Sequence, residues 1–271
     1  MENRAIGIFD SGIGGLTVLK EIRNVLPNEN IIYYGDNINN PYGNKTAQEI
    51  FDLSFKMINF LLAQDVKLIV IACNTISAVC FDKLNQIFKD RVKLIEIIKS
   101  GVKAGFLSVR KNKYKSLGLL ATEATVSSNA YQNFFYKRDA KINLIAKSCP
   151  DLVKLAEKNL FDTEISKNIL SEYLGDFKLK NINILILGCT HFPVFENQIK
   201  KILPGVEIIN PAKFVALKVK KYLEQNNILN KNIRPKMIFY TSGDKKNFNI
   251  VANQILDYNF PCDCFINKVL D

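Results

Sequence analysis

Short apolar runs alternate with segments of helical spacing along most of the chain. The runs are bounded by Gly, Asp or Pro and are too short to be buried helices, which predicts strands buried on both faces. Strands that alternate with helices are typical of βαβ units, so we expect an α/β protein with mainly parallel sheets. The predicted strands are residues 6–9, 31–34, 68–72, 93–97, 116–120, 142–146, 184–187, 206–209 and 237–240.

The segments between these strands predict amphipathic helices. Leu16, Leu19 and Ile22 recur at helical spacing, and Pro27 ends that helix. The sequence Pro-Tyr-Gly at 41–43 marks a loop. The other predicted helices are residues 46–62, 76–88, 129–135, 152–174 and 214–223, with a last one that begins near 248.

Two of the predicted strands end in the same way, with a small residue, then a cysteine, then short polar residues. The cysteines are Cys73 and Cys189. Each half also has an earlier strand that ends in a polar turn, at Asp10 and at Thr122. Cys73 lies 63 residues after Asp10, and Cys189 lies 67 after Thr122. These separations predict two pseudo-symmetric α/β domains, residues 1–97 with 208–271 and residues 98–207.

The paired cysteines predict an active site between the two halves. Ligands of open α/β sheets bind at the carboxyl ends of strands. Two thiols at facing sheet edges suit the removal of a proton from one face of a carbon and its return on the other. Buried structural cysteines would also follow apolar strands, because free Cys packs as a small hydrophobe. The matching sequences around Cys73 and Cys189 favour a functional role over a structural one.

His191 is the single histidine of the chain and lies two residues after Cys189. Its titration near neutrality makes it a suitable acid/base partner for that thiol. A structural histidine is the plainer alternative. A Cys-His hydrolase is the catalytic alternative, and it leaves Cys73 unexplained. Cys189 and His191 do not by themselves supply the three or four ligands of a zinc site, so no metal is expected there.

A glycine-rich turn, residues 10–15, follows the first strand and opens the first helix. Its spacing fits neither a dinucleotide fingerprint nor a phosphate-binding loop. The glycines allow close approach of the backbone, and a helix N-terminus favours anions. A carboxylate at Asp10 suits an ammonium or a catalytic group better than an anion. A tight strand-to-helix turn without a ligand is the alternative.

The composition is that of a globular protein and does not suggest a membrane protein or a disulfide-rich secreted one. The chain has 271 residues, of which 48% are apolar, so it can bury a substantial core. No apolar run approaches the roughly 20 residues that span a bilayer, and residues 1–4 are too short and polar for a secretory signal. We therefore expect a cytoplasmic protein without a membrane segment. The six cysteines show no disulfide-scaffold spacing. Cys262 and Cys264 suit a C-terminal strand pair better than a metal site.

The formal net charge is +11, which we interpret mainly as a Lys-rich solvated surface. An acidic small-molecule substrate would gain some electrostatic steering from it. A nucleic-acid partner is not supported, because the chain has no dense Lys/Arg stripe and no recognised binding motif. The most basic segment, residues 231–236, reads as a loop.

Five segments, in family order and at family spacing, resemble the glutamate racemases of the cofactor-independent aspartate/glutamate racemase superfamily. The resemblance extends over about residues 6–256. The segments are 9–16, 34–36 with 41–43, 72–75, Thr122 with Thr125, and 188–193.

The resemblance implies two flavodoxin-like domains with L- or D-glutamate bound between them, without pyridoxal phosphate or metal. Cys73 and Cys189 would be the two bases, the first deprotonating D-glutamate and the second L-glutamate. His191 and Asp10 would assist the thiols, and Glu157 would lie near the second one. The residues implied to bind the substrate are Asp10, Ser11, Pro41, Tyr42, Gly43, Asn74, Thr75, Thr122 and Thr190.

The resemblance also implies a cytoplasmic homodimer that supplies D-glutamate for peptidoglycan. The chain departs from the family pattern at Asn37, Asn39, Ala121 and Asn210, where Thr, Arg, Gly and Asp are frequent. These positions concern loop conformation, dimer contacts and regulation more than the paired cysteines.

Two alternatives stay open on the sequence. One is an aspartate or other amino-acid racemase of the same superfamily. A pocket of limited depth would accept the shorter side chain of aspartate and exclude the longer one, although the Pro-Tyr-Gly and Gly-Cys-Thr-His motifs favour glutamate. A binding protein, like the family members that inhibit DNA gyrase, is compatible with the basic charge but has no other support in the sequence. The binding role predicts function that survives the loss of both thiols.

Overall fold

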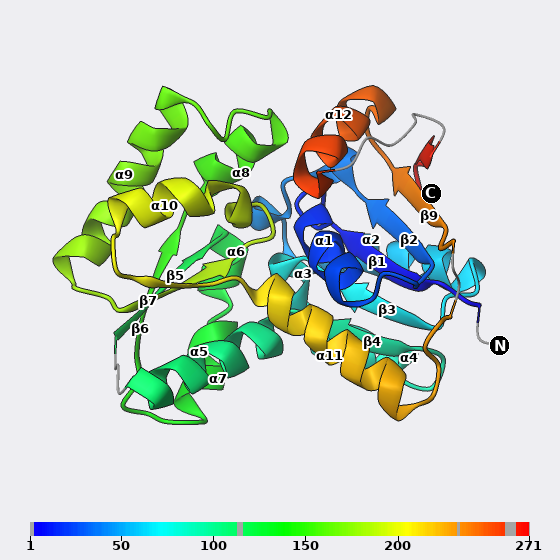
Figure 1. The fold of residues 1–271 in the computed structure, drawn as a ribbon, viewed down its shortest axis with the longest axis horizontal. Coiled ribbons are helices and arrows are strands. Elements are labelled where there is room, and N and C mark those ends of the chain that lie inside the picture. The colour runs from blue at the N-terminus through cyan, green and yellow to red at the C-terminus, as the bar shows by residue number, and fades with distance from the viewer. Residues whose placement is uncertain (1–2, 113–115, 232–233, 258–263, 271) are drawn as a thin grey trace.

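The computed structural model describes residues 3–112, 116–231, 234–257 and 264–270. Its strands form two sheets, which make two lobes that lie side by side (Figure 1). Every strand pairing within these ranges is parallel, as the sequence predicts.

The first sheet, sheet A, has the strand order β10-β9-β2-β1-β3-β4, and the second, sheet B, has the order β6-β5-β7-β8. The strands of sheet A are β1 (Ile6–Asp10), β2 (Ile31–Gly35), β3 (Leu68–Ile71), β4 (Lys93–Glu96), β9 (Met237–Thr241) and β10 (Phe265–Asn267). Those of sheet B are β5 (Ser116–Ala121), β6 (Asn143–Ser148), β7 (Ile184–Gly188) and β8 (Glu207–Ile209).

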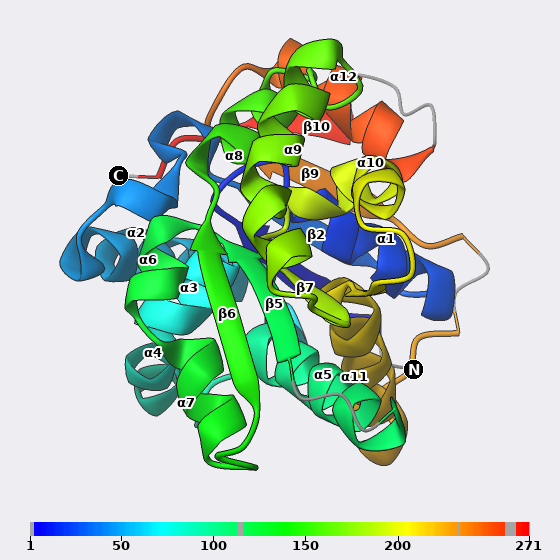
Figure 2. The same cartoon turned by 90° about the vertical axis from the view of Figure 1, so that its left-hand side faces the viewer.

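Helices cover both sheets. Figure 2 faces the lobe of sheet B, with β6 nearest the viewer and helices to either side of the strands. The helices that precede or accompany sheet B are α5 (Ile98–Asn112), α6 (Glu123–Ser127), α7 (Ala130–Tyr136), α8 (Pro150–Glu157), α9 (Glu164–Leu179) and α10 (Glu196–Ile202). The others are α1 (Leu16–Val25), α2 (Ala47–Ala63), α3 (Asn74–Val79), α4 (Phe81–Phe88), α11 (Pro211–Gln225) and α12 (Lys245–Leu256).

The two sheets repeat one topology. In the first four strands of sheet A the order is 2-1-3-4, and β5 to β8 follow the same order within sheet B. In such sheets the chain turns in opposite directions on either side of the first strand, which leaves a crevice at the carboxyl ends of the first and third strands. The predicted site residues follow β1, β3, β5 and β7, the strands that flank these two crevices.

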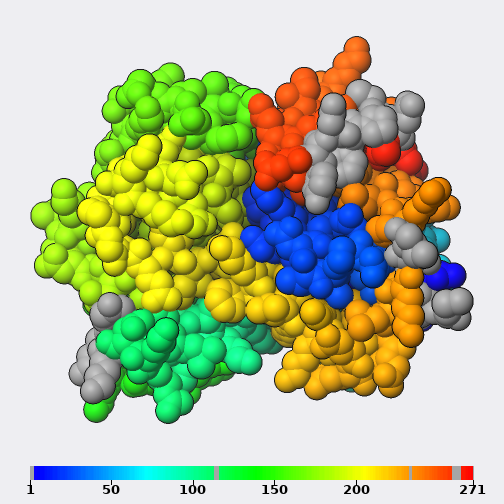
Figure 3. Space-filling view, viewed as in Figure 1, coloured from blue at the N-terminus to red at the C-terminus, as the bar shows by residue number. Residues whose placement is uncertain are grey.

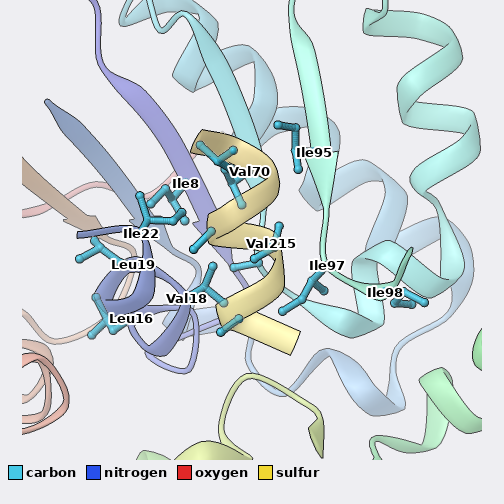
Figure 4. Packing of buried hydrophobic residues seen from close by; sticks show 14 of the residues in the cluster. Ile8, Leu16, Val18, Leu19, Ile22, Val70, Ile95, Ile97, Ile98 and Val215 are labelled. Atoms are coloured by element: carbon cyan, nitrogen blue, oxygen red, sulfur yellow. The ribbon is translucent and has the colours of Figure 1, made fainter. Parts of the chain in front are cut away.

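A shared apolar core joins the lobes on the side of α5 and α11. It includes Ile8 and Val70 of sheet A, Leu117 and Ile186 of sheet B, and Val215 of α11. Figure 4 shows Val215 near Val18 of α1, Val70 of β3 and Ile97, which follows β4. Burying one such side chain stabilises a fold by about 1.5–3 kcal/mol, so this shared core holds the lobes together. The predicted domain boundaries at 97 and 207 stay a prediction, and β8 continues two residues past the second, to Ile209.

Two of the predicted helices are wrong in their extent. The helix predicted at 76–88 is two helices that meet at Cys80, whose backbone leaves the helical conformation. The helix predicted at 152–174 stops at Glu157, and a new one begins after Thr163, which forms a capping box with Ser166. Apolar spacing continues across both breaks, so periodicity alone does not reveal them.

The sequence patterns did not predict the helix α5, and at the C-terminus they predicted a strand pair at Cys262 and Cys264. α5 carries two glycines, which lower helix propensity. Cys262, half of the predicted C-terminal strand pair, lies outside the described residues, and Cys264 directly precedes β10. In the part of the chain that the structure describes, no helix combines the length and apolarity needed to cross a membrane.

Candidate active site

One small cavity lies between the carboxyl edges of the two sheets. The space in it that the centre of a water molecule can occupy is about 10 Å³, so the cavity holds roughly one water. An amino acid therefore enters only when the lining residues separate. The lining residues are Ser11, Asn40, Pro41, Tyr42, Gly43, Cys73, Asn74, Thr75, Thr122, Val153, Cys189, Thr190 and His191.

Both predicted thiols reach this cavity, one from each sheet. Cys73 follows β3 and Cys189 follows β7. Both are buried, and both belong to the free cysteines of the described chain. The structure thus brings together two cysteines that lie in different halves of the sequence.

The surroundings of Cys73 favour a protonated thiol. Burial and the nearby Asp10 raise the pKa of Cys73 to about 12, although the Ile76 backbone N–H and the Ser11 hydroxyl lower it. The Sγ of Cys73 is 3.6 Å from Oγ of Ser11. Only a group that takes its proton, or a shift in the neighbouring charge, makes Cys73 a base.

Cys189 has a different partner. Its Sγ is 3.6 Å from Nδ1 of His191, and Nε2 of His191 is 2.7 Å from Oε1 of Glu157. Burial alone would lower the pKa of His191, but the hydrogen bonds with Cys189 and Glu157 outweigh it and raise that pKa well above its usual range. Cys189 thus lies beside an imidazole and Cys73 beside a hydroxyl, so the two thiols have unequal surroundings.

Asp10 lies behind the cavity, at the end of β1. Its Oδ2 accepts hydrogen bonds from the backbone N–H groups of Gly12 (3.2 Å) and Gly15 (3.0 Å). The Thr190 hydroxyl donates to its Oδ1 across the two lobes, at 3.3 Å. Burial raises the pKa of Asp10 to about 6, against the lowering effect of His191 and the two backbone donors. Asp10 thus contacts the lining of both sheets without reaching the cavity itself.

Asn74, Thr75 and Thr122 form a polar side of the cavity. The hydroxyls of Thr75 and Thr122 lie 2.8 Å apart, and the Tyr131 hydroxyl donates to Oδ1 of Asn74 at 2.8 Å. The Nδ2 of Asn74 is buried and has no hydrogen-bond partner among the described residues. A buried donor without a partner costs free energy, so this amide is suited to an acceptor group of a ligand.

The Pro-Tyr-Gly loop borders the cavity but uses its hydroxyl elsewhere. Tyr42 is buried, and its OH donates to Oδ2 of Asp36 at 2.5 Å. The Ser242 hydroxyl donates to the other oxygen of Asp36, at 2.7 Å. The loop is thereby fastened to the end of β9, and the ring and backbone of Tyr42 are what remain for a ligand.

The glycine-rich turn allows the second lobe to approach closely. A Cβ atom on Gly14 would lie 2.5 Å from Oγ1 of Thr190 and 2.7 Å from Nδ1 of His191. The Thr17 hydroxyl also donates to the backbone oxygen of Thr190, at 2.9 Å. Figure 3 shows the corresponding blue and yellow segments in contact on one face of the molecule. The turn therefore has a packing reason for its glycine.

Asn40 and Val153 line the cavity although the sequence did not single them out as site residues. Asn40 belongs to a run of polar residues that follows β2, a position that could have marked it. Val153 lies inside an apolar helix pattern and carries no such signal. Glu157 lies at the edge of the site, through its contact with His191.

Larger hollows lie elsewhere on the molecule. One, of about 510 Å³, lies near Asn30 and Lys236, away from both thiols. Its larger size does not make it the site, because it brings no predicted catalytic group together. Among the described residues no group of three or more His, Cys, Asp or Glu side chains is arranged to hold a metal ion.

Comparison with known proteins finds relatives that are similar to this protein over nearly the whole chain. Residues 15–219 match the family described as Asp/Glu/Hydantoin racemase. Glutamate racemase 2 of Caldanaerobacter subterraneus subsp. tengcongensis is 40% identical over 257 residues, 94% of each chain.

Solved structures give the same result. A glutamate racemase from Francisella tularensis, in complex with D-glutamate, is 36% identical with a TM-score of 0.89 and covers 100% of this chain and 99% of its own. A glutamate racemase isoform from Bacillus anthracis has a TM-score of 0.92 at 33% identity, with the same coverage.

Proposed function

The chain belongs to the Asp/Glu/hydantoin racemase family, and we propose that Cys73 and Cys189 interconvert L- and D-glutamate from opposite faces of the α-carbon. By its similarity to relatives of that name, the enzyme is a glutamate racemase, an amino-acid racemase. The observation that supports the two-thiol mechanism is a cavity that both cysteines line, each from its own sheet.

The unequal thiols suggest the order of proton transfers. With L-glutamate, the Cys189 thiolate takes the α-proton and becomes a thiol, leaving a carbanion. The Cys73 thiol then donates its proton to the opposite face, which gives D-glutamate and a Cys73 thiolate. In the reverse direction the two residues exchange roles. One proton must move from Cys189 to Cys73, through solvent, before L-glutamate reacts again.

The developing negative charge needs preorganised donors, because an α-proton beside a carboxylate is a very weak acid. The unpartnered amide of Asn74 and the hydroxyls of Thr75 and Thr122 face the cavity and suit the substrate carboxylate. Ser11 and Thr190 suit the α-amino group, with Asp10 behind them as the balancing charge. The closed cavity keeps water from the carbanion.

We test this mechanism by α-proton exchange in deuterated water with each glutamate enantiomer, for the wild type, Cys73→Ser and Cys189→Ser. We expect exchange and inversion in the wild type and loss of racemisation in each variant, by at least about 100-fold. A variant with one thiol that still racemises glutamate would contradict the mechanism. Activity on aspartate but not on glutamate would keep the family and overturn the substrate.

The wider role follows the family. D-glutamate is a peptidoglycan precursor, and the free cysteines of the described chain suit a reducing, cytoplasmic compartment. A homodimer is part of the same proposal. Exposed apolar side chains at Leu107 of α5 and Leu217 of α11 offer surface for such an interface. Analytical ultracentrifugation measures it directly, and a monomer at enzyme concentrations would overturn it.

A further inference from the structure

The carboxylate of Glu157 is held by residues of the opposite lobe. Nδ2 of Asn40 donates to its Oε1, and Nδ2 of Asn37 donates to its Oε2 at 3.3 Å. The backbone N–H of Ile13 also donates to Oε1, at 3.3 Å. Glu157 itself ends α8, which follows β6 of sheet B. A helix C-terminus carries partial negative charge and does not stabilise a carboxylate, so these donors must come from elsewhere.

The orientation of Asn37 is itself fixed. The Thr241 hydroxyl accepts from the backbone N–H of Gly243 at 3.1 Å and donates to Oδ1 of Asn37 at 3.0 Å. With its oxygen occupied in this way, the amide of Asn37 directs its Nδ2 at Glu157. A reversed amide would set oxygen against carboxylate and remove the bond from Thr241.

Together these contacts form one continuous chain of hydrogen bonds. The series starts at Thr241, at the end of β9, and crosses between the lobes from Asn37 to Glu157. It continues to Nε2 of His191 and ends where Nδ1 of His191 meets Cys189. Room for it depends on Gly12, where a Cβ atom would lie 2.4 Å from Oε1 of Glu157 and 2.6 Å from Nδ2 of Asn40. Hydrogen bonds in such a chain polarise one another.

We propose that Asn37 and Asn40, the asparagine clamp, are positioning residues that hold Glu157 against His191 and so prepare Cys189 to act as a base. This inference rests on the two-thiol function proposed above. Asn40 also lines the cavity, but the positioning effect of both asparagines acts through Glu157.

The clamp also links the chemistry to the closing of the cleft. Asn37 and Asn40 follow β2 in sheet A, whereas Glu157 and His191 belong to the lobe of sheet B. The side chain of Glu157 is 20% exposed, so without its donors it can turn to solvent. When the lobes separate to admit substrate, His191 loses its oriented partner. Closure restores it, which confines the reactive thiolate to the closed site.

The single histidine makes the clamp directly measurable. In a protein labelled at histidine, one imidazole resonance reports the protonation of His191 by NMR. The charged or titratable groups that face it are Cys189 beside it, Glu157 from α8 and Asp10 from β1. We expect Asn37→Ala with Asn40→Ala to lower the pKa of His191 by about one unit or more, because the charge of Glu157 is no longer held against the imidazole.

Asn39→Ala is the matched control. Asn39 lies in the same loop, but its Nδ2 donates to Asp36 at 3.0 Å and not to Glu157. We expect this variant to keep the His191 pKa of the wild type. Glu157→Gln, which retains the shape of the side chain without its charge, should reproduce the effect of the double variant. Each variant is first checked for a native amide spectrum, and the single Asn37→Ala and Asn40→Ala variants serve if the double variant does not fold.

Kinetics give the second measurement. We expect the double variant to lower kcat for L-glutamate by about 10- to 100-fold, part of the usual contribution of acid/base catalysis, with a smaller change in KM. A folded double variant with an unchanged or raised His191 pKa overturns the clamp, whatever its activity. The NMR titration does not depend on turnover, so failure of the two-thiol mechanism in the exchange experiment is a separate result.

Discussion

At the scale of the residue, the buried carboxyl of Asp10 makes the stability of the fold depend on pH. Its carboxyl is fully buried and keeps two backbone donors and one hydroxyl donor. Burial nevertheless raises its pKa from 3.8 to about 6. The folded protein therefore prefers the protonated form more than the unfolded chain does. This preference stabilises the fold below pH 3.8 and is lost as the pH rises through about 6.

Asp10→Asn should accordingly stabilise the protein at neutral pH. A shift of about 2.2 units, at 1.36 kcal/mol per unit, corresponds to about 3 kcal/mol at pH 7.5. This figure already includes the backbone hydrogen bonds from Gly12 and Gly15, which lower the pKa of Asp10. We expect the gain in the free energy of unfolding to vanish below about pH 4, and racemase activity to fall at least about tenfold. Urea unfolding at several pH values measures the first, and a gain that persists at pH 4 would contradict the burial argument.

At the scale of the element, the turn from β1 to α1 decides how closely the lobes approach. Gly14 lies where a single methyl group would collide with Thr190 and His191. The same turn supplies the Gly12 and Gly15 backbone donors to Asp10. A short glycine-rich segment thus fixes a carboxylate of one lobe and receives the cysteine-bearing loop of the other.

Gly14→Ala should separate the two loops at the site. We expect it to destabilise the protein by about 1–3 kcal/mol, as overpacking does, and to reduce activity because His191 moves away from Cys189. The matched control is Gly175→Ala in α9, where an added Cβ meets nothing within 4 Å. That variant should gain roughly 0.5–1 kcal/mol of stability and keep full activity. Thermal unfolding and racemase assays compare the pair, and equal behaviour would refute the steric argument.

At the scale of the whole molecule, the lobes are joined unevenly. On the side of α5 and α11 they share an apolar core. At the carboxyl edges, polar contacts such as Thr75 with Thr122 and Thr190 with Asp10 hold them together. Polar contacts exchange for water at little net cost, whereas apolar burial does not. Opening should therefore occur at the active-site side, about a hinge near α5 and α11.

Hydrogen exchange tests this uneven connection. Backbone amides of residues 42–44 and 123–127 at the cleft should exchange through opening, and saturating L-glutamate should slow them. At a hundred times Kd the slowing should reach about 100-fold, since the ligand binds only across both lobes. Amides of α9, far from the cleft, should keep their rates, because local fraying there does not involve opening. If glutamate leaves the exchange rates of the cleft amides unchanged, the closure model is contradicted.

The sequence determined the elements and the chemistry that each strand presents. The strands are predicted well because their short apolar runs are buried on both faces, and the sequence alone places each cysteine at a strand end. The ends of helices are predicted less well from the sequence, as Cys80 and the break after Glu157 show, because apolar spacing continues across these breaks. The roles of the individual site residues stay predictions until the variants are measured.

Only the tertiary structure decided which of these residues meet. The contact of Glu157 with Asn37 and Asn40 joins positions 120 and 117 residues apart, and no local pattern reports it. The raised pKa of Asp10 and the buried, unpartnered amide of Asn74 among the described residues likewise arise from burial in the folded protein. Local propensity and hydrophobic spacing are properties of neighbouring residues. Distance, burial and charge at the site are properties of the packed molecule, and these govern its acid/base chemistry.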